Sequence, residues 1–340
     1  MSLLDDGPRL TLKEIASRAG VHISTVSRAL KEPRRPTKSK TTTAIREIAD
    51  SLGYQQDGYA SALRTGKART IGVLVPRFTD VVHASIYEGI DKAAVSAGYN
   101  TVVSISRDQS ALQLTCLATL LNRRVEGIIV QDARLGSEVT RILKKKQIPY
   151  LLAIRTLPGE LSVSVDDVEG GRLAGEYLID CGHKKVAVIS GDLAVSTGRD
   201  RLEGFLLAFR RAGIEIPPAN IIEAGFSLAS GREAADRLLG LAETPTAIFA
   251  SNDFTAVGVM AALRHAGLRV GEDVAVVGYN DVELAAQLPV PLTTIHSPLG
   301  KIGELSFSTL LSRMQGEEVH SIKISPQLRV RESTSLWTPR

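Results

Sequence analysis

The chain has 340 residues, of which 44% are hydrophobic and 4% aromatic, and its formal net charge is +4. This length suits a small module joined to a body of one or two lobes, and the aliphatic composition favours an α/β protein over a β-sandwich or a disordered chain. Its two cysteines lie far apart without metal-type Cys/His spacing, so the sequence predicts no disulfide framework, no metal site and no cofactor.

The N-terminal segment carries the positive charge. Before residue 70 there are thirteen basic and seven acidic residues, whereas the remainder holds 28 basic and 30 acidic ones. A basic head of this kind suggests a polyanionic partner. Near the N-terminus there is no basic stretch with an apolar run typical of a signal peptide, and no later segment has the uninterrupted apolar length of a membrane span. We therefore expect a cytoplasmic protein without a membrane partner.

Three short helices are predicted in the head. Apolar residues recur at helical spacing over 12–19 and stop at Gly20, and a second apolar face lies within 23–31. Two short helices joined by a tight turn make a helix-turn-helix, and a third periodic stretch over 44–52 supplies the apolar face that they need. The pattern alone can be purely structural, because paired short helices occur in many folds.

The polar residues of the head favour DNA as the partner. The second helix carries hydroxyl side chains and Arg28 but no acid, and the connector over 31–40 is rich in arginine and lysine. Such cations neutralise phosphates while the helix reads base edges in the major groove. The alternative for the connector is an ordinary solvated loop.

The segments LTLKEIASRAGVHISTVSRALK, LGY and ASALRTGKARTIGVLVP resemble the LacI/GalR family of transcription regulators, and the resemblance covers essentially the whole chain. It implies base reading by Ile23 and Ser24, a third major-groove contact by Arg28, and phosphate contacts by Thr25 and Ser27. The DNA-contacting positions in the head are therefore expected to be Thr11, Ile23, Ser24, Thr25, Ser27 and Arg28.

Two residues of the recognition helix depart from the family pattern. His22 stands where the family has a serine that caps this helix, so the helix start lacks a good side-chain acceptor unless Ser24 or the imidazole substitutes. Ile23 offers only apolar contact, for instance to a thymine methyl group.

Residues 55–69 link the head to the body, and by themselves they resemble a polar linker with one helical turn of alanine and leucine. The family resemblance implies a hinge helix that folds on DNA, with Leu63 wedged into the minor groove. Gln56 and Asp57 replace the usual proline and asparagine, and Gly58 weakens the helix further. Asp57 is a candidate cap for its N-terminus.

From Thr70 onward, short apolar runs alternate with helical periods, first over 70–154 and again over 185–280. Such unalternating strands separated by helices predict parallel sheets covered on both faces, and two series predict two lobes with a cleft. The expected fold is an all-α helix-turn-helix head plus an α/β body of two lobes, similar by resemblance to periplasmic sugar-binding proteins. The expected domains are a DNA-binding head over 1–54, a hinge over 55–69 and an effector-binding, dimerising body over 70–340.

Open α/β sheets bind ligands at the carboxyl ends of their strands, so polar residues beyond those ends are candidates for a binding site. They are Arg77, His83, Asp132, Arg155, Asp166, Arg201, Asn252, Asp253, Asn280 and Asp281. The resemblance places Arg201 on the effector-binding arginine and Asn252 and Asn280 on further effector contacts. It places on the pocket wall Val82, His83, Asp132, Arg155, Thr197 and Phe249.

Each candidate has a structural alternative: Asp166 and Asp253 as helix N-caps, Arg155 as a surface charge, and His83 as a hydrogen-bonded histidine near a helix start. Asn280 replaces the aspartate that is common in sugar-binding members. Because Arg77, Arg155 and Arg201 would lie near it, we hypothesise an effector that is a sugar or, with the acid lost, a sugar acid.

A helix-turn-helix reads two half-sites as a twofold pair, so we expect a homodimer on double-stranded operator DNA. The helix near 84–97 and the stretch 284–292 resemble family dimer surfaces, and no heptad tail for a tetramer follows. We expect no enzyme, since nucleophile-elbow, Walker and dinucleotide motifs are absent from the sequence. A pure solute-binding protein would fit the body but not the head. The expected function is effector-controlled transcription regulation, most simply repression, and an inducer and a corepressor fit equally well.

Overall fold

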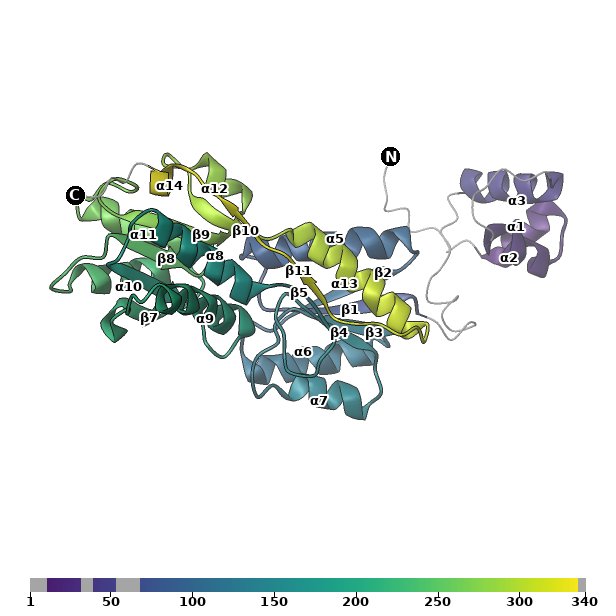
Figure 1. Ribbon diagram of the computed structural model, residues 1–340. Coiled ribbons are helices and arrows are strands. Elements are labelled where there is room, and N and C mark those ends of the chain that lie inside the picture. Colours follow the sequence, from purple (N-terminus) through teal and green to yellow (C-terminus); the bar gives the residue numbers. More distant parts are fainter. Residues whose placement is uncertain (1–10, 32–38, 53–67, 336–340) are drawn as a thin grey trace. The chain divides into compact units, whose positions relative to one another are not determined.

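The computed structural model describes residues 11–31, 39–52 and 68–335 (Figure 1). The chain divides into two compact units, Met1–Ala68 and Arg69–Arg340. Most of the basic connector and the hinge residues Gln56, Asp57 and Leu63 lie outside the described residues.

The head contains α1 (Leu12–Ala19), α2 (Ile23–Lys31) and α3 (Lys40–Ser51), as the apolar periodicity predicts. Gly20 ends α1 in the left-handed conformation with φ of 62°, and Ser39 caps α3 by accepting from the Thr42 amide at 3.3 Å. Each helix contributes two buried side chains to the core of the head, which consists of Ile15, Ala16, Val26, Ala29, Ile45 and Ala49.

The first lobe of the body, here lobe A, is built on a six-stranded sheet in the order β11-β5-β4-β3-β1-β2, with all pairs parallel. Its apolar strands are buried on both faces, since α5 and α13 cover one face and α6 and α7 the other (Figure 1). The elements are β1 (Thr70–Val75), α5 (Val81–Ser96), β2 (Asn100–Ile105), α6 (Ser110–Asn122), β3 (Gly127–Val130), α7 (Glu138–Lys145), β4 (Tyr150–Ala153), β5 (Ser162–Val165), α13 (Leu299–Met314) and β11 (Ile322–Ile324).

The second lobe, lobe B, has a six-stranded sheet in the order β12-β10-β9-β8-β6-β7. Helices α8 and α9 pack together over one part of it and α10 and α11 over another. Strand β12 runs antiparallel to β10 at one edge, whereas the other strand pairs of this sheet are parallel, as expected. The elements are α8 (Asp167–Asp180), β6 (Val186–Ser190), α9 (Ser196–Arg211), η1 (Pro218–Asn220), β7 (Ile221–Glu223), α10 (Leu228–Leu239), β8 (Ala247–Ala250), α11 (Asp253–His265), β9 (Ala275–Asn280), α12 (Glu283–Gln287), β10 (Thr293–His296), β12 (Gln327–Arg329) and α14 (Glu332–Ser335).

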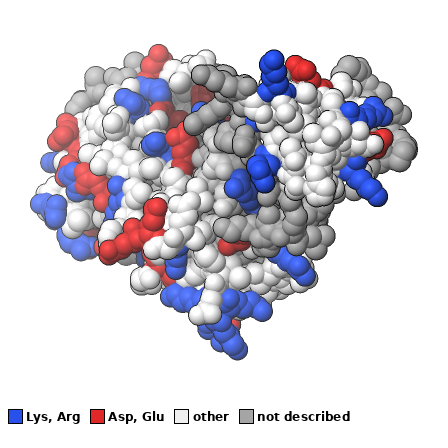
Figure 2. All heavy atoms as spheres, turned by 90° about the vertical axis from the view of Figure 1, so that its right-hand side faces the viewer, with Lys and Arg blue, Asp and Glu red and all other residues white. Residues whose placement is uncertain are grey.

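Helix α7 illustrates how the outer helices divide their faces. Val139 and Leu143 are buried against the sheet, whereas Arg141, Lys144 and Lys145 are exposed. Helix α7 lies at the bottom of Figure 1 and stays at the same height in Figure 2, where basic side chains gather on the lowest part of the surface. The helix therefore stabilises lobe A through its apolar face and carries its charged side chains on the outer face, where Lys144 pairs with Glu160 at 2.8 Å.

The polypeptide passes between the lobes three times. It leaves lobe A between β5 and α8, returns between β10 and α13, and leaves again between β11 and β12. Two of these passages are bonded side by side, because the Asp166 amide donates to the Ile324 carbonyl at 3.0 Å. Each sheet thus receives its last strand from the C-terminal part of the chain.

Helices α8 and α9 approach each other closely through glycine. A Cβ atom on Gly204 would collide with the Val168 carbonyl, and one on Gly171 with the Arg201 carbonyl. This packing brings the first turn of α8 beside α9, at the end of lobe B that carries Asp167 and Arg201. Among the helices that the structure describes, none has the length and hydropathy to span a bilayer.

Candidate functional site

Helix α2 presents its polar residues outward from the head. Val26 and Ala29 are buried in the core, whereas Ser24, Thr25 and Arg28 are exposed. Ile23 is 41% exposed although it is a large apolar side chain, and Ser27 is half-buried. Thr11 is the exposed N-cap residue of α1, and its side chain makes no capping bond there. On α2, the expected DNA contacts Ile23, Ser24, Thr25 and Arg28 thus form an exposed surface with apolar, hydroxyl and cationic groups.

The start of α2 has a side-chain acceptor after all. The Ser24 amide donates to His22 Nδ1 at 3.3 Å, and Ser24 Oγ lies 2.8 Å from the same nitrogen. Because a backbone amide can only donate, Nδ1 is the acceptor in the contact with the Ser24 amide. The imidazole therefore substitutes for the serine that the sequence lacks here.

Backbone strain marks the carboxyl ends of the sheets in the body. Arg107 and Asp108 after β2, Ile154 after β4, and Asn280 and Asp281 at the end of β9 have φ between 56° and 105°. For a β-branched residue such as Ile154, with φ of 65°, this conformation is rare. Strain of this kind persists where the surroundings hold it in place, and it clusters at binding sites.

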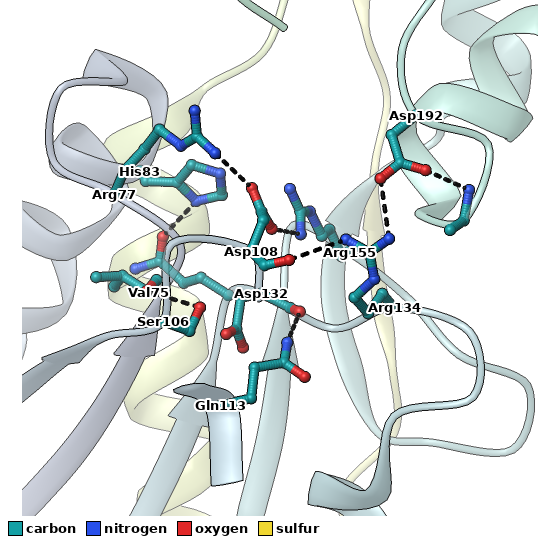
Figure 3. A network of polar contacts seen from close by, with 12 residues as sticks. Val75, Arg77, His83, Ser106, Asp108, Gln113, Asp132, Arg134, Arg155 and Asp192 are labelled. Carbon is teal, nitrogen blue, oxygen red and sulfur yellow. Dashed lines mark hydrogen bonds and ion pairs between the residues drawn. The ribbon is translucent and has the colours of Figure 1, made fainter. Parts of the chain in front are cut away.

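Asp108 organises the wall of lobe A (Figure 3). Its Oδ1 accepts from Arg155 Nη1 at 2.8 Å, and its Oδ2 accepts from Arg77 Nη2 at 3.3 Å. Burial works to raise the pKa of Asp108, but the guanidinium of Arg155 and its hydrogen bond hold that pKa below its usual range. Arg155 is 3% exposed, so the alternative of a surface charge is wrong.

His83 and Asp132 are two further residues of this wall, and both are buried. His83 Nδ1 is 3.0 Å from Gln131 Oε1, and burial together with Arg155 lowers the pKa of His83 to about 4, so the ring is neutral near pH 7. The carboxylate oxygens of Asp132 find no hydrogen-bond partner among the described residues, and burial raises the pKa of Asp132. Figure 3 shows this carboxylate turned toward Gln113 rather than toward Arg155.

Arg201 organises the facing wall of lobe B. Its Nε donates to Asp167 Oδ1 at 2.7 Å, its Nη1 to the Ser251 carbonyl at 2.7 Å, and its Nη2 to Asn280 Oδ1 at 3.4 Å. The guanidinium carbon lies 3.7 Å from the centre of the Tyr279 ring, and the side chain is 2% exposed. Burial raises the pKa of Asp167, and Arg201 opposes that shift.

Other expected site residues make their described contacts outside these two networks. Asn252 caps α11, since its Oδ1 accepts from the Thr255 amide at 2.7 Å and its Nδ2 donates to the Phe226 carbonyl at 3.0 Å. Phe249 is in the core of lobe B, stacked on Phe205 with 4.9 Å between ring centroids. Val82 and Thr197 are buried in the first turns of α5 and α9.

The two helix-cap alternatives have opposite outcomes. Asp166 caps α8, with its Oδ1 accepting from the Glu169 amide at 3.3 Å. Asp253 caps no helix, because Asn252 has that position in α11. Instead its carboxylate accepts from the Val282 amide at 2.8 Å and from Thr294 Oγ1 at 2.5 Å, and burial raises its pKa to about 7.

Direct contacts join the two walls. Arg134 Nη2 lies 3.1 Å from Asp192 Oδ2, the Leu135 amide donates to the Ala194 carbonyl at 2.9 Å, and the Thr156 amide donates to Ser196 Oγ at 2.8 Å. Arg134 also donates to the Asp108 carbonyl at 3.4 Å, so the lobe A network continues into lobe B (Figure 3).

Sequence reasoning missed several members of these networks, namely Asp108, Arg134, Asp167, Asp192 and Tyr279. Asp108 and Asp192 follow β2 and β6 closely, so the rule of inspecting polar residues beyond strand ends would have found them. The structure brings together Arg77, His83 and Arg155 from lobe A, and Arg201 and Asn280 from lobe B.

Two family models match the chain. The model of bacterial regulatory proteins of the lacI family matches residues 11–57, and the model of the periplasmic binding protein-like domain matches residues 176–334. The HTH-type transcriptional repressor PurR of Vibrio vulnificus (strain CMCP6) is 32% identical over 331 residues, which cover 95% of this chain and 98% of that protein.

Solved structures agree with this assignment. The lac repressor dimer bound to operator and the anti-inducer ONPF has a TM-score of 0.86 and 29% identity, over 96% of this chain and 99% of that one. The complex of the transcriptional regulator CelR with cellobiose has a TM-score of 0.74 and 28% identity, over 96% of this chain and all (100%) of that one. With a helix-turn-helix head, a two-lobed body and relatives that match along nearly its full length, the chain belongs to the lacI family of bacterial regulatory proteins.

Proposed function

We propose that this regulator is a repressor whose affinity for operator DNA is controlled by a small molecule held between the two lobes of the body. The observation that carries the proposal is the pair of buried polar walls at the carboxyl ends of the two sheets, centred on Arg155 with Asp108 and on Arg201 with Asp167. Ligands of open α/β sheets bind at this edge.

The DNA contacts follow from the exposed face of α2. Ile23, Ser24 and Arg28 face outward and would meet base edges, with Ile23 limited to apolar contact. Thr11, Thr25 and Ser27 would bind phosphates, which fix the register of the head on the duplex. Leu63 would enter the minor groove as an apolar wedge.

The effector is a sugar or a sugar acid. Hydroxyl-rich ligands need many hydrogen-bonding partners, and buried polar groups at the strand ends, such as Arg201, Asn280 and His83, offer donors and acceptors. Support also comes from the similarity to the CelR complex with cellobiose, a neutral sugar. The same lobe A and lobe B walls would contact the ligand together with Val82, Asp132, Arg155, Thr197, Phe249 and Asn252.

The working form is a homodimer in which two heads read two half-sites. The similar lac repressor structure is a dimer on its operator. Large apolar side chains are exposed on the two surfaces expected to pair, including Val81 and Val95 of α5 and Leu284 of α12. Burial of such apolar side chains against a partner subunit stabilises the dimer.

Control of DNA binding would be a population shift. The effector favours one angle between the lobes, and that angle changes the distance between the two hinge segments and the free energy needed to fold them on DNA. A ligand shifts this equilibrium only by its differential affinity for the two arrangements.

Selection of bound sites from random duplex DNA, with and without a metabolite pool, tests the proposal. We expect a palindromic site whose enrichment changes with the pool, and deletion of residues 1–69 should abolish binding. Failure of the full-length chain to enrich any site, at low salt as well as high, would contradict a DNA-binding function.

A further inference from the structure

Each arginine that could attract an anionic effector already has a carboxylate partner. Arg155 and Arg77 share Asp108, and Arg201 is paired with Asp167. The ion pairs of Arg155 and Arg201 are short, at 2.8 Å and 2.7 Å, and their arginines are almost completely buried. Each arginine that the sequence places at the cleft is therefore already engaged by a carboxylate of the protein itself.

Asp108 is held firmly as the partner of Arg155. Its two carboxylate oxygens go to different arginines, its backbone carbonyl accepts from Arg134, and the carboxyl group is ionised because Arg155 depresses its pKa. An anionic ligand that took the place of this carboxylate on Arg155 would leave Asp108 partly buried without its main counter-ion. Such an uncompensated buried charge is strongly unfavourable.

The remaining groups of the lobe A wall supply no replacement charge. His83 is neutral near pH 7 because burial lowers its pKa to about 4. Asp132 is a second buried acid close enough to Arg155 and Asp108 to interact with both electrostatically. Arg134 is paired with Asp192 across the lobes. An entering carboxylate would thus meet paired cations and two resident acids.

We propose that Asp108 determines the charge specificity of the cleft: as the resident counter-ion of Arg155 and Arg77, it directs the cleft toward uncharged, hydroxyl-bearing ligands and against anionic ones. The inference rests on the proposed function, since it concerns the ligand of the same cleft. It selects the neutral sugar from the two effector classes considered above. Asp108 becomes a specificity-determining residue that the family resemblance does not point to.

The test is Asp108→Asn, which removes the charge and suits the backbone, because φ at this position is 56° and asparagine tolerates left-handed geometry better than most residues. Sodium D-glucuronate is titrated into each protein by calorimetry, with sodium chloride holding the ionic strength constant and D-glucose as the uncharged counterpart. The wild type should show no saturable binding of glucuronate. The variant should bind glucuronate saturably, with an affinity at least about tenfold above the detection limit of the wild-type titration, because a buried arginine without a carboxylate is a strong anion site.

Two controls separate this effect from others. Glu243→Gln removes one negative charge from an exposed ion pair with Lys185 and should bind glucuronate as the wild type does. Adding Arg155→Gln to Asp108→Asn should abolish the gain. If Asp108→Asn unfolds, Asp108→Gly removes the same carboxylate at a position whose φ suits glycine, and the same gain is expected.

Saturable glucuronate binding by the wild type would overturn the proposal, as would a folded Asp108→Asn or Asp108→Gly protein without gain. These outcomes are independent of whether the chain selects an operator from random DNA. Failure of the proposed function and failure of this inference are therefore distinguishable.

Discussion

At the scale of single residues, Arg201 is the most completely bonded side chain of the candidate site. All three nitrogens of its guanidinium donate hydrogen bonds, and its flat face covers Tyr279. A lysine at this position would bring a charge of the same sign but could not reproduce the fork of donors or the stacking.

We expect Arg201→Lys to lower the free energy of unfolding of the body by about 3 kcal/mol, because Asp167 would lose its bonded partner in a buried place. Urea unfolding monitored by circular dichroism measures this change. Arg199→Lys is the matched control, since Arg199 lies on the same helix in a more exposed pair with Asp200 and should change stability by less than about 0.5 kcal/mol. Equal losses of stability in both variants would contradict the prediction that Arg201 stabilises the body more than Arg199 does.

The buried imidazole of His83 predicts a pH dependence. Its pKa is about 4 in the folded state, against 6.5 for an unperturbed histidine. Below pH 6.5 the unfolded chain therefore binds a proton that the folded chain does not. The free energy of unfolding consequently decreases as the pH is lowered from 6.5 to about 4. Between pH 7 and pH 5 this single group should remove about 2 kcal/mol from the free energy of unfolding.

His83→Gln should abolish that part of the loss, which urea unfolding at the two pH values measures as the difference between variant and wild type. Replacing the exposed His265 in the same way should leave the pH dependence unchanged. A wild-type slope retained by His83→Gln would show that the ring titrates normally in the folded protein.

Residue positions near strand ends were predictable, but their partners were not. The sequence places His83, Arg155, Arg201 and Asn280 at the correct edge of the sheets, because strand ends follow from hydrophobic runs. That Arg155 pairs with Asp108, 47 residues away, depends on which loops the strand order brings together. For the same reason, nothing local distinguishes Asn252 as a helix cap from Asn252 as a ligand contact.

At the scale of elements, the contact between α8 and α9 holds the Arg201 wall in place. Gly204 lies against the backbone of α8, where a methyl group would meet the Val168 carbonyl and the Arg172 amide. Backbone atoms cannot rotate aside as a flexible side chain can, so the helices must separate to admit it.

We therefore expect Gly204→Ala to destabilise the body by about 1–3 kcal/mol through overpacking, although alanine favours an isolated helix. Gly300→Ala is the matched control, because its added Cβ would meet no atom within 4 Å in α13. Thermal unfolding of both variants tests this prediction. An unchanged melting temperature for Gly204→Ala would mean that α8 and α9 can separate enough to admit a methyl group without loss of stability.

Long apolar strands were predictable from the sequence and short polar ones were not. The runs that became β1, β3, β6 and β9 are continuous and aliphatic, as buried parallel strands require. In β10 (Thr293–His296), by contrast, Thr293 and Thr294 are fully buried because Ser333 and Asp253 satisfy them. Such partners are distant in sequence, so composition alone gives no strand signal there.

Helix α5 begins at Val81, earlier than its periodicity suggests, because Asp80 caps it with a 3.0 Å bond to the Val82 amide.

At the scale of the whole body, the contacts across the lobes set their relative position. Arg134 and Asp192 form the charged contact, and the amides of Leu135 and Thr156 in lobe A donate to acceptors in lobe B. Exchange of these two amide protons with solvent therefore reports directly on separation of the lobes.

We expect Arg134→Gln to increase hydrogen exchange at Leu135 and Thr156 several-fold, because one attractive contact between the lobes is lost, while strand amides inside each lobe stay protected. Mass spectrometry of the exchanged protein measures this. Lys185→Gln, which breaks an exposed pair within lobe B, should leave both amides as they are. Unchanged exchange in Arg134→Gln would mean that the ion pair does not contribute to holding the lobes together.

The two lobes were predictable from two series of alternating strands and helices, but their shared boundary was not. The alternation of strands and helices predicts one series over 70–154 and another over 185–280, which the sheets confirm. This pattern does not predict that β11 and α13 return to lobe A, because the apolar residues of α13 suit either lobe. Only the paired strand edges decide which sheet receives the C-terminal segments.

The triple passage of the chain has a consequence for how the protein is made. Lobe A consists mainly of residues synthesised first, yet its edge strand β11 and the covering helix α13, with the buried Ile302, Phe307 and Leu310, emerge from the ribosome only after most of lobe B. Until then only α5 covers that face of the early sheet, and the nascent chain exposes the apolar surface that α13 later buries. The lobes therefore complete their folding together, near the end of synthesis, rather than one after the other.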